Sequence, residues 1–287
     1  MKAPKVFALS LVLVAALSLT GCGTSETTDG TSDSGELTGS ITVQGSDTMV
    51  NLSQAWAEAF QADNAGVSVS VNGGGSGTGI ASLINGTVDF ANASREMKDE
   101  EVDQAKGAGV DPVEIEVAKD GIVVLVNPEN AVEDLSIEQI GQIYRGEITN
   151  WKDVGGVDKP IVLLGRDTSS GTYEYFKEEV VGKDAEYAKS MKNLQSSQAI
   201  VDEVGKNVDA IGYVGIGYES SSIKPLDVEG VTASIDTVLD GTYPLSRGLY
   251  MYSAGEPDGA KKAYIEWILG ADGQSVVEDQ GFVPLSK

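Results

Sequence analysis

The fold is constrained most by a unit that recurs early in this chain: a short apolar strand, a turn of small or hydroxylated residues, and then a helix. The glycine-rich stretch V-N-G-G-G-S-G-T-G-I at 71–80 is the longest of these turns. The expected strands lie at 41–45, 67–71 and 88–91, and the helices that follow them lie at 46–60, from 80 onward and at 99–106. Regular alternation of strand and helix predicts an α/β lobe with a largely parallel sheet.

The later part of the chain repeats the unit and contains two longer extended runs. A strand at 161–164 leads into G-R-D-T-S-S-G-T and a helix at 173–180. The extended run at 113–126 exceeds an ordinary strand, so it is a candidate crossover between lobes, and 243–252 is a candidate return. We expect lobe I to comprise 40–119 with 245–287, and lobe II to comprise 120–244.

The N-terminus has the pattern of an exported lipoprotein. Lys2 and Lys5 precede an apolar run at 6–19, which is too short to span a bilayer and ends in Leu-Thr-Gly-Cys. We expect a lipoprotein signal peptide at 1–21, cleavage before Cys22 and lipidation of that cysteine. The polar stretch that follows, Gly/Ser/Thr/Asp/Glu-rich up to residue 39, is typical of a flexible tether. The protein would then be held at the extracytoplasmic face of the cell membrane.

Composition excludes several classes of function. The 44 acidic and 20 basic residues give a net charge of −24, which argues against nucleic-acid binding and against adhesion to anionic lipid. The chain contains no histidine, so a Ser-His-Asp triad, a Cys-His dyad and a histidine-ligated metal site are excluded. No cofactor or metal is expected.

Four turns point to one oxyanion pocket. They are Gly45-Ser46-Asp47-Thr48, Gly75-Ser76-Gly77-Thr78-Gly79, Ser94-Arg95, and Arg166 with Ser169-Ser170-Gly171-Thr172. Ligands in open α/β sheets lie beyond the carboxyl ends of the strands, where helix N-termini supply N–H groups. Hydroxyl groups add further donors. Each turn alone is also consistent with ordinary turn or N-cap chemistry, but together they favour a site for a tetrahedral anion.

Two arginines strengthen this interpretation. Arg95 and Arg166 are two of only four arginines in the chain, and both follow predicted strands. The planar guanidinium suits bidentate contact with an oxyanion. The alternative is that either arginine forms a structural ion pair on the acidic surface.

These motifs, in this order, resemble the phosphate-binding lipoproteins of phosphate ABC importers, the PstS type. The resemblance runs from Ile41 to the C-terminus and rests on G-S-D-T, N-G-G-G-S-G-T-G-I, V-D-F-A-N-A-S-R, A-K-D-G-I, Y-R-G-E-I-T-N-W and G-R-D-T-S-S-G-T. It implies a type II periplasmic-binding-protein fold, in which two lobes joined by two crossover strands close around inorganic phosphate.

The resemblance also implies site residues and partners. Lobe I would supply Ser46, Thr48, Ser76, Ser94 and Arg95, and lobe II would supply Arg166, Ser170, Gly171 and Thr172. The partners would be phosphate and the membrane permease subunits of an importer, with the receptor itself expected to be a monomer. Nothing in Y-R-G-E-I-T-N-W suggests a donor, so we expect it to serve lobe packing.

Selectivity against sulfate should come from a carboxylate. Family members use one to accept the hydrogen bond of protonated phosphate, whereas sulfate has no proton to give. In the best-known branch an aspartate follows the V-D-F strand, but here Ser94-Arg95 occupies that turn. Asp120 at the expected crossover is the first replacement candidate, and Asp47 is the second.

Two other functions stay open. A phosphatase could use Ser76 or Ser170 as nucleophile, but the chain offers no evident activating base, so we expect that it is not an enzyme. A receptor for sulfate, molybdate or tungstate would use the same fold with another anion.

Overall fold

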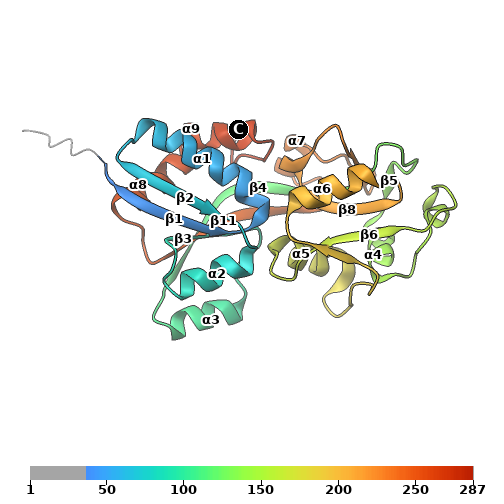
Figure 1. Cartoon of the computed structure of the whole chain (residues 1–287), viewed down its shortest axis with the longest axis horizontal. Helices are drawn as coiled ribbons and strands as arrows, with labels where there is room; N and C mark the ends of the chain where they lie inside the picture. The colour runs from blue at the N-terminus through green and yellow to red at the C-terminus, as the bar shows by residue number, and fades with distance from the viewer. Residues whose placement is uncertain (1–36, 287) are drawn as a thin grey trace, which may run out of the picture. The chain divides into compact units, whose positions relative to one another are not determined.

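The computed structural model describes residues 37–286, which form an α/β unit around one mixed sheet (Figure 1). The expected signal peptide, Cys22 and nearly all of the tether lie outside the described residues. Within 37–286 the main sheet has nine strands in the order β2-β1-β3-β11-β4-β8-β6-β7, with β9 paired to β4. In this same part of the chain, no helix combines the length and the apolar character needed to cross a membrane.

The first three strand–turn–helix units form what we call the first half of the sheet, together with two C-terminal helices. β1 lies between β2 and β3 and is parallel to both, and the parallel pairing confirms the sequence prediction. The members of this half are β1 (Gly39–Gly45), α1 (Val50–Asp63), β2 (Val67–Asn72), α2 (Ser76–Ile84), β3 (Phe90–Ala93), α3 (Asp99–Gly107), α8 (Gly259–Leu269) and α9 (Ala271–Asp279).

Both faces of this half are buried, because β3 alternates its side chains between two apolar clusters. Phe90 belongs to the larger cluster, which also contains Trp56 of α1 and Tyr264 of α8. Ala91 and Ala93 point to the other face and pack with residues of α2. Helices therefore cover both faces of this half of the sheet, and a ligand site is expected at the carboxyl ends of its parallel strands.

Two long strands connect this half with the rest of the sheet. β4 (Pro112–Val126) pairs antiparallel with β11 (Ser246–Ala254) from Pro112↔Ala254 to Gly121↔Ser246. From Ile122 onward β4 pairs instead with β8 (Ala210–Gly215). β4 is therefore shared by both parts of the sheet, and Figure 1 shows β4 and β11 running between them.

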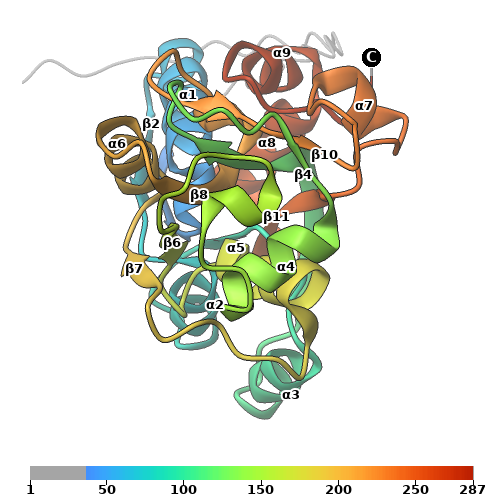
Figure 2. The same ribbon diagram turned by 90° about the vertical axis from the view of Figure 1, so that its right-hand side faces the viewer.

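We call the strands and helices beyond this point the second half. Its parallel strands β6 and β8 carry α6 on one face and α4 and α5 on the other (Figures 1 and 2). Every residue of β8 is buried, as expected for a strand covered on both faces. Besides β8, the members are α4 (Ile137–Arg145), β6 (Val162–Arg166), α5 (Gly171–Phe176), β7 (Lys192–Leu194) and α6 (Ser197–Lys206).

Short elements complete the described chain. They are η1 (Asp47–Met49), β5 (Asp134–Leu135), η2 (Trp151–Val154), η3 (Lys177–Gly182), η4 (Ile216–Tyr218), β9 (Lys224–Pro225), β10 (Asp227–Val228) and α7 (Ile235–Leu239).

Several expected boundaries shift. α2 begins at Ser76 rather than at residue 80, because Gly79 N donates to Gly75 O and continues the helix into the glycine-rich stretch. α5 likewise begins at Gly171, two residues before the expected start. The run at 113–126 is one continuous strand, since Lys119, Asp120 and Gly121 all keep their pairing with β11. The residue ranges assigned to lobes I and II stay a prediction.

Candidate functional site

Buried hydroxyl groups from both halves meet at the ends of the parallel strands. We call Ser46, Thr48, Ser76, Ser94 and Thr172 the hydroxyl cluster, and each is at most 2% exposed. Ser46 Oγ donates to Ser94 Oγ over 2.9 Å, and Ser76 Oγ lies 3.4 Å from Ser94 Oγ. Thr48 Oγ1 and Thr172 Oγ1, from opposite halves, are 2.7 Å apart. The cluster thus brings together sequence-predicted hydroxyls from all four turns.

Glycines allow the two halves to approach this closely. An ideal Cβ on Gly171 would lie 2.3 Å from Ser76 Oγ and 2.8 Å from Ser94 Oγ. Gly75 has a φ of 92°, and a Cβ there would lie 2.5 Å from Ser169 O. Gly77 N donates to the same carbonyl oxygen over 3.0 Å. Backbone from α2 and from the turn before α5 therefore meets without intervening side chains.

Arg166 ends β6 and is fully buried. Its Nη1 donates to Ser197 Oγ over 2.8 Å, and its Nη2 donates to Asp47 Oδ2 and Gln195 O, each over 3.0 Å. Its Nε is buried and has no hydrogen-bond partner among the described residues. Burial lowers the pKa of the guanidinium, against the opposing effect of Asp47. A buried charged donor without an acceptor costs free energy. An anion oxygen would supply the acceptor that Arg166 Nε lacks.

Arg247 of β11 is a second buried arginine at the site, and our sequence analysis missed it. The β-sheet register places it directly opposite Asp120 of β4. Its Nη1 donates to Ser94 O over 2.8 Å and its Nη2 donates to Thr172 Oγ1 over 3.0 Å. A signal was present in the sequence, since Arg247 is one of the four arginines and interrupts the extended run at 243–252.

The two candidate carboxylates are each paired with an arginine. Asp120 is fully buried; its Oδ2 accepts from Arg247 Nε and Nη2, and its Oδ1 accepts from Ile216 N. Burial raises the pKa of Asp120 above its ordinary value, although Arg247 opposes that rise. Asp47 accepts from Arg166 through Oδ2, and from Gly74 N through Oδ1 over 3.1 Å. Two arginines and two aspartates leave the site with no formal net charge.

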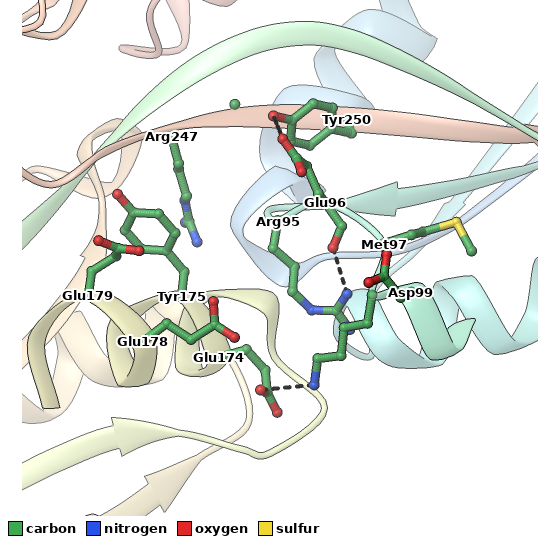
Figure 3. Close-up of a pocket in the computed structure, with 12 residues that line it drawn as sticks. Arg95, Glu96, Met97, Asp99, Glu174, Tyr175, Glu178, Glu179, Arg247 and Tyr250 are labelled. Carbon is green, nitrogen blue, oxygen red and sulfur yellow. Dashed lines mark hydrogen bonds and ion pairs between the residues drawn. The ribbon is translucent and has the colours of Figure 1, made fainter. Parts of the chain in front are cut away.

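Arg95 lies apart from the hydroxyl cluster. Its Nη1 and Nη2 donate to the two carboxylate oxygens of Glu101 over 2.7 and 2.8 Å, which is the ion pair that the alternative interpretation describes. It lines a cavity of about 450 Å³ together with Arg247, Tyr175 and Lys98 (Figure 3). A donor role for Arg95 stays a prediction, and no contact of this residue with the cluster supports it.

The remaining predicted residues border the site. Ser170 is buried and caps α5 by accepting from Tyr173 N. Ser169 lines a second cavity of about 490 Å³ with Asp47 and Gly74. Thr78 lies in the first turns of α2 and is partly buried. Across residues 37–286, no group of three or more acidic or cysteine side chains is arranged to hold a metal ion.

Comparison with known proteins agrees with this architecture. Residues 24–272 match the family model described as a PBP superfamily domain. A protein from Staphylococcus saprophyticus named phosphate-binding protein PstS is 37% identical over 287 residues, covering 95% of this chain and 88% of that protein. Its namesake from Pseudomonas aeruginosa is 32% identical over 272 residues, covering 87% and 84%.

Solved structures give the same result. One is a putative phosphate ABC transporter substrate-binding protein from Clostridium perfringens with bound phosphate; it has a TM-score of 0.81 and 34% identity, covering 86% of this chain and all of that one. An ABC-type phosphate transport receptor from Vibrio cholerae has a TM-score of 0.71 and 29% identity, covering 85% and 99%. The chain therefore belongs to the PBP superfamily and, within it, to the family of PstS phosphate-binding proteins.

Proposed function

We propose that this protein is an extracytoplasmic receptor that captures inorganic phosphate between its two halves and delivers it to an ABC importer. The observation that carries the proposal is the buried Nε of Arg166, a charged donor without an acceptor among the described residues, on a guanidinium that pairs with Asp47 of the first half. The names of the relatives supply the ligand, since several are phosphate-binding proteins and one structure is described with phosphate bound.

The donors divide between the halves. From the first half, Ser46, Thr48, Ser76 and Ser94 would donate hydroxyl hydrogens, and Thr78 would present its N–H group at the start of α2, where Gly77 N already donates to Ser169 O. From the second half, Arg166 would add charge, and Ser169, Ser170, Gly171 and Thr172 surround the N-terminus of α5. Helix N-termini and hydroxyls stabilise an anion without adding counter-charge, so a neutral site can still bind a dianion.

Binding would favour closure. The halves touch through Thr48 and Thr172 and through Gly77 N and Ser169 O, as expected of a closed arrangement. A phosphate that contacts both halves interacts with the closed form more strongly than with an open one, so it shifts the population toward closure. The closed receptor would then dock on the permease subunits.

Rejection of sulfate would depend on an acceptor for the phosphate proton. Asp47 is suited to this because its Oδ1 accepts only from Gly74 N, and its side chain is 15% exposed beside the second cavity. Sulfate would place an unprotonated oxygen against this carboxylate, which costs free energy without a compensating hydrogen bond.

The remaining parts of the proposal concern attachment and chemistry. Lipidation of Cys22 would tether the receptor to the membrane as a monomer. We propose that it has no enzymatic activity, because the chain lacks histidine and Ser76 and Ser170 contact no basic side chain in any described hydrogen bond.

Calorimetry with an Arg166→Gln variant tests the function. Loss of a charged hydrogen-bond donor costs about 1.5–3 kcal/mol, so phosphate affinity should fall about ten- to hundred-fold. Arg145→Gln is the matched control, because Arg145 pairs with Glu138 and Glu147 on the surface. Titrations with sulfate, molybdate and tungstate should show weaker binding, and p-nitrophenyl phosphate should not be turned over. Sulfate bound as tightly as phosphate, or measurable turnover, would contradict the proposal.

A further inference from the structure

Arg247 contacts three separate parts of the site. Its guanidinium reaches the crossover strand β4 through Asp120, the first half through Ser94 O, and the second half through Thr172 Oγ1. Its side chain is only 3% exposed. The Tyr175 ring of α5 covers it, with the guanidinium carbon 5.5 Å from the ring centroid. An ion pair with Asp120 alone would not require these contacts with both halves.

Asp120 holds this arginine in one orientation. Nε donates to Asp120 Oδ2 over 3.0 Å and Nη2 donates to the same oxygen over 2.7 Å, while Ile216 N occupies Oδ1. The Gly215 backbone packs on the carboxylate so closely that an added Cβ would lie 2.8 Å from either oxygen. Because Asp120 is fully buried and the Gly215 backbone covers both of its oxygens, whereas the Asp47 side chain is 15% exposed, Asp120 is better placed to orient Arg247 than to accept a proton from a ligand.

The contacts left to Arg247 are those a ligand would share. Nη1 donates to the main-chain oxygen of Ser94, and Nη2 donates to the hydroxyl of Thr172, a member of the hydroxyl cluster. The Arg247 side chain also lines the cavity of about 450 Å³, together with Arg95 and the carboxylates of Glu174, Glu178 and Glu179 (Figure 3). The guanidinium therefore contacts Ser94 and Thr172 and also borders this cavity.

We propose that Arg247 is a phosphate-contacting residue that clamps both halves, and that Asp120 is its positioning residue. This inference rests on the proposed function of the same site. It assigns Asp120 a different role from the proton acceptor that the sequence suggested.

A double-mutant cycle separates the two roles of Asp120. Arg247→Gln, Asp120→Asn and the double variant are titrated calorimetrically with phosphate and with sulfate. If Asp120 acts through Arg247, each single variant should lose about ten-fold or more in phosphate affinity, and the double variant should bind no more weakly than Arg247→Gln. Sulfate affinity should not rise in Asp120→Asn. A rise of sulfate binding in Asp120→Asn, or additive losses in the double variant, would overturn the positioning role.

Controls keep the test independent of folding and of the proposed function. Removing one partner of a buried ion pair can destabilise the fold, so Arg247→Lys is measured as well. Lysine keeps the positive charge but cannot make the bidentate hydrogen bonds of a guanidinium. The phosphate affinity of Arg247→Lys should therefore lie between those of the wild type and Arg247→Gln. Wild type that binds no phosphate, or Arg166→Gln that binds normally, would refute the function itself. Normal binding by both Arg247 variants, with Arg166→Gln impaired, would refute only the inference.

Discussion

Substituting Gly171 by alanine should weaken phosphate binding by obstructing closure, although it removes no hydrogen-bonding group. The added Cβ would lie 2.3 Å from Ser76 Oγ, 2.8 Å from Ser94 Oγ and 3.0 Å from Ser76 Cβ, where ordinary contacts are 3.4–4 Å. Rotating the Ser76 hydroxyl alone does not relieve the overlap, because the Cβ contact remains. Both serines belong to the first half and Gly171 to the second, so the overlap exists only when the halves are together.

The size of the effect follows from the cost of overpacking a well-filled interior. That cost is typically about 1–3 kcal/mol, which corresponds to a loss of about 5- to 150-fold in phosphate affinity. The second half should not be destabilised, because Gly171 is the first residue of α5 and does not have a left-handed φ. Alanine also favours a helix over glycine. The backbone N–H, a predicted phosphate donor, is retained.

The assay combines calorimetry with small-angle scattering of the wild type and the variant, each with and without phosphate. The variant should bind more weakly and become less compact with phosphate than the wild type does. Gly107→Ala is the matched control, because a Cβ at that helix end meets nothing within 4 Å. Equal affinity and equal compaction in Gly171→Ala would refute the idea that these glycine contacts define the closed state.

Two further predictions follow from the charges of the molecule. Burial tends to raise the pKa of Glu101, but hydrogen bonds from Arg95 and Lys98 N outweigh burial and hold the pKa below its ordinary value. Ionised Glu101 therefore stabilises the folded protein at neutral pH, and this stabilisation is lost as the pH falls. Urea unfolding should therefore give the wild type a higher free energy of unfolding than Glu101→Gln at neutral pH, by less than about 1 kcal/mol for such a partly exposed pair. This difference should disappear as the pH falls, and an unchanged difference at acidic pH would contradict the prediction. Phosphate affinity should change little with added salt despite the net charge of −24. The arginines of the site are already paired and buried, and surface charges are screened beyond about 10 Å. A steep loss of affinity with salt would show that unpaired charge dominates binding.

The sequence predicted the layered α/β architecture well because its signals are local. Apolar alternation marks β1, β2 and β3, and each ends in a small or hydroxylated residue before a helix. Since parallel strands end at one edge, the positions of Ser46, Ser76 and Ser94 near one another follow from that pattern.

The identity of the second buried arginine could not be obtained in this way. Arg95 occupies a promising turn, but Glu101, six residues later at the start of α3, takes both ends of its fork. Arg247 reaches the cluster through the antiparallel register of β11 and β4, which joins residues 127 positions apart. No local pattern specifies such a register, so only the folded sheet reveals the Asp120–Arg247 pair.

The shared strand β4 also bears on how cheaply the molecule can open. Because β4 continues from its partner β11 to its partner β8 without leaving the sheet, the joint between the halves is a hydrogen-bonded ribbon and not a slack linker. Such a ribbon can twist or bend but has few other conformations. Ligand binding therefore causes only a small loss of conformational entropy in the connecting strands. Almost all of the binding free energy is then available for recognition of the anion.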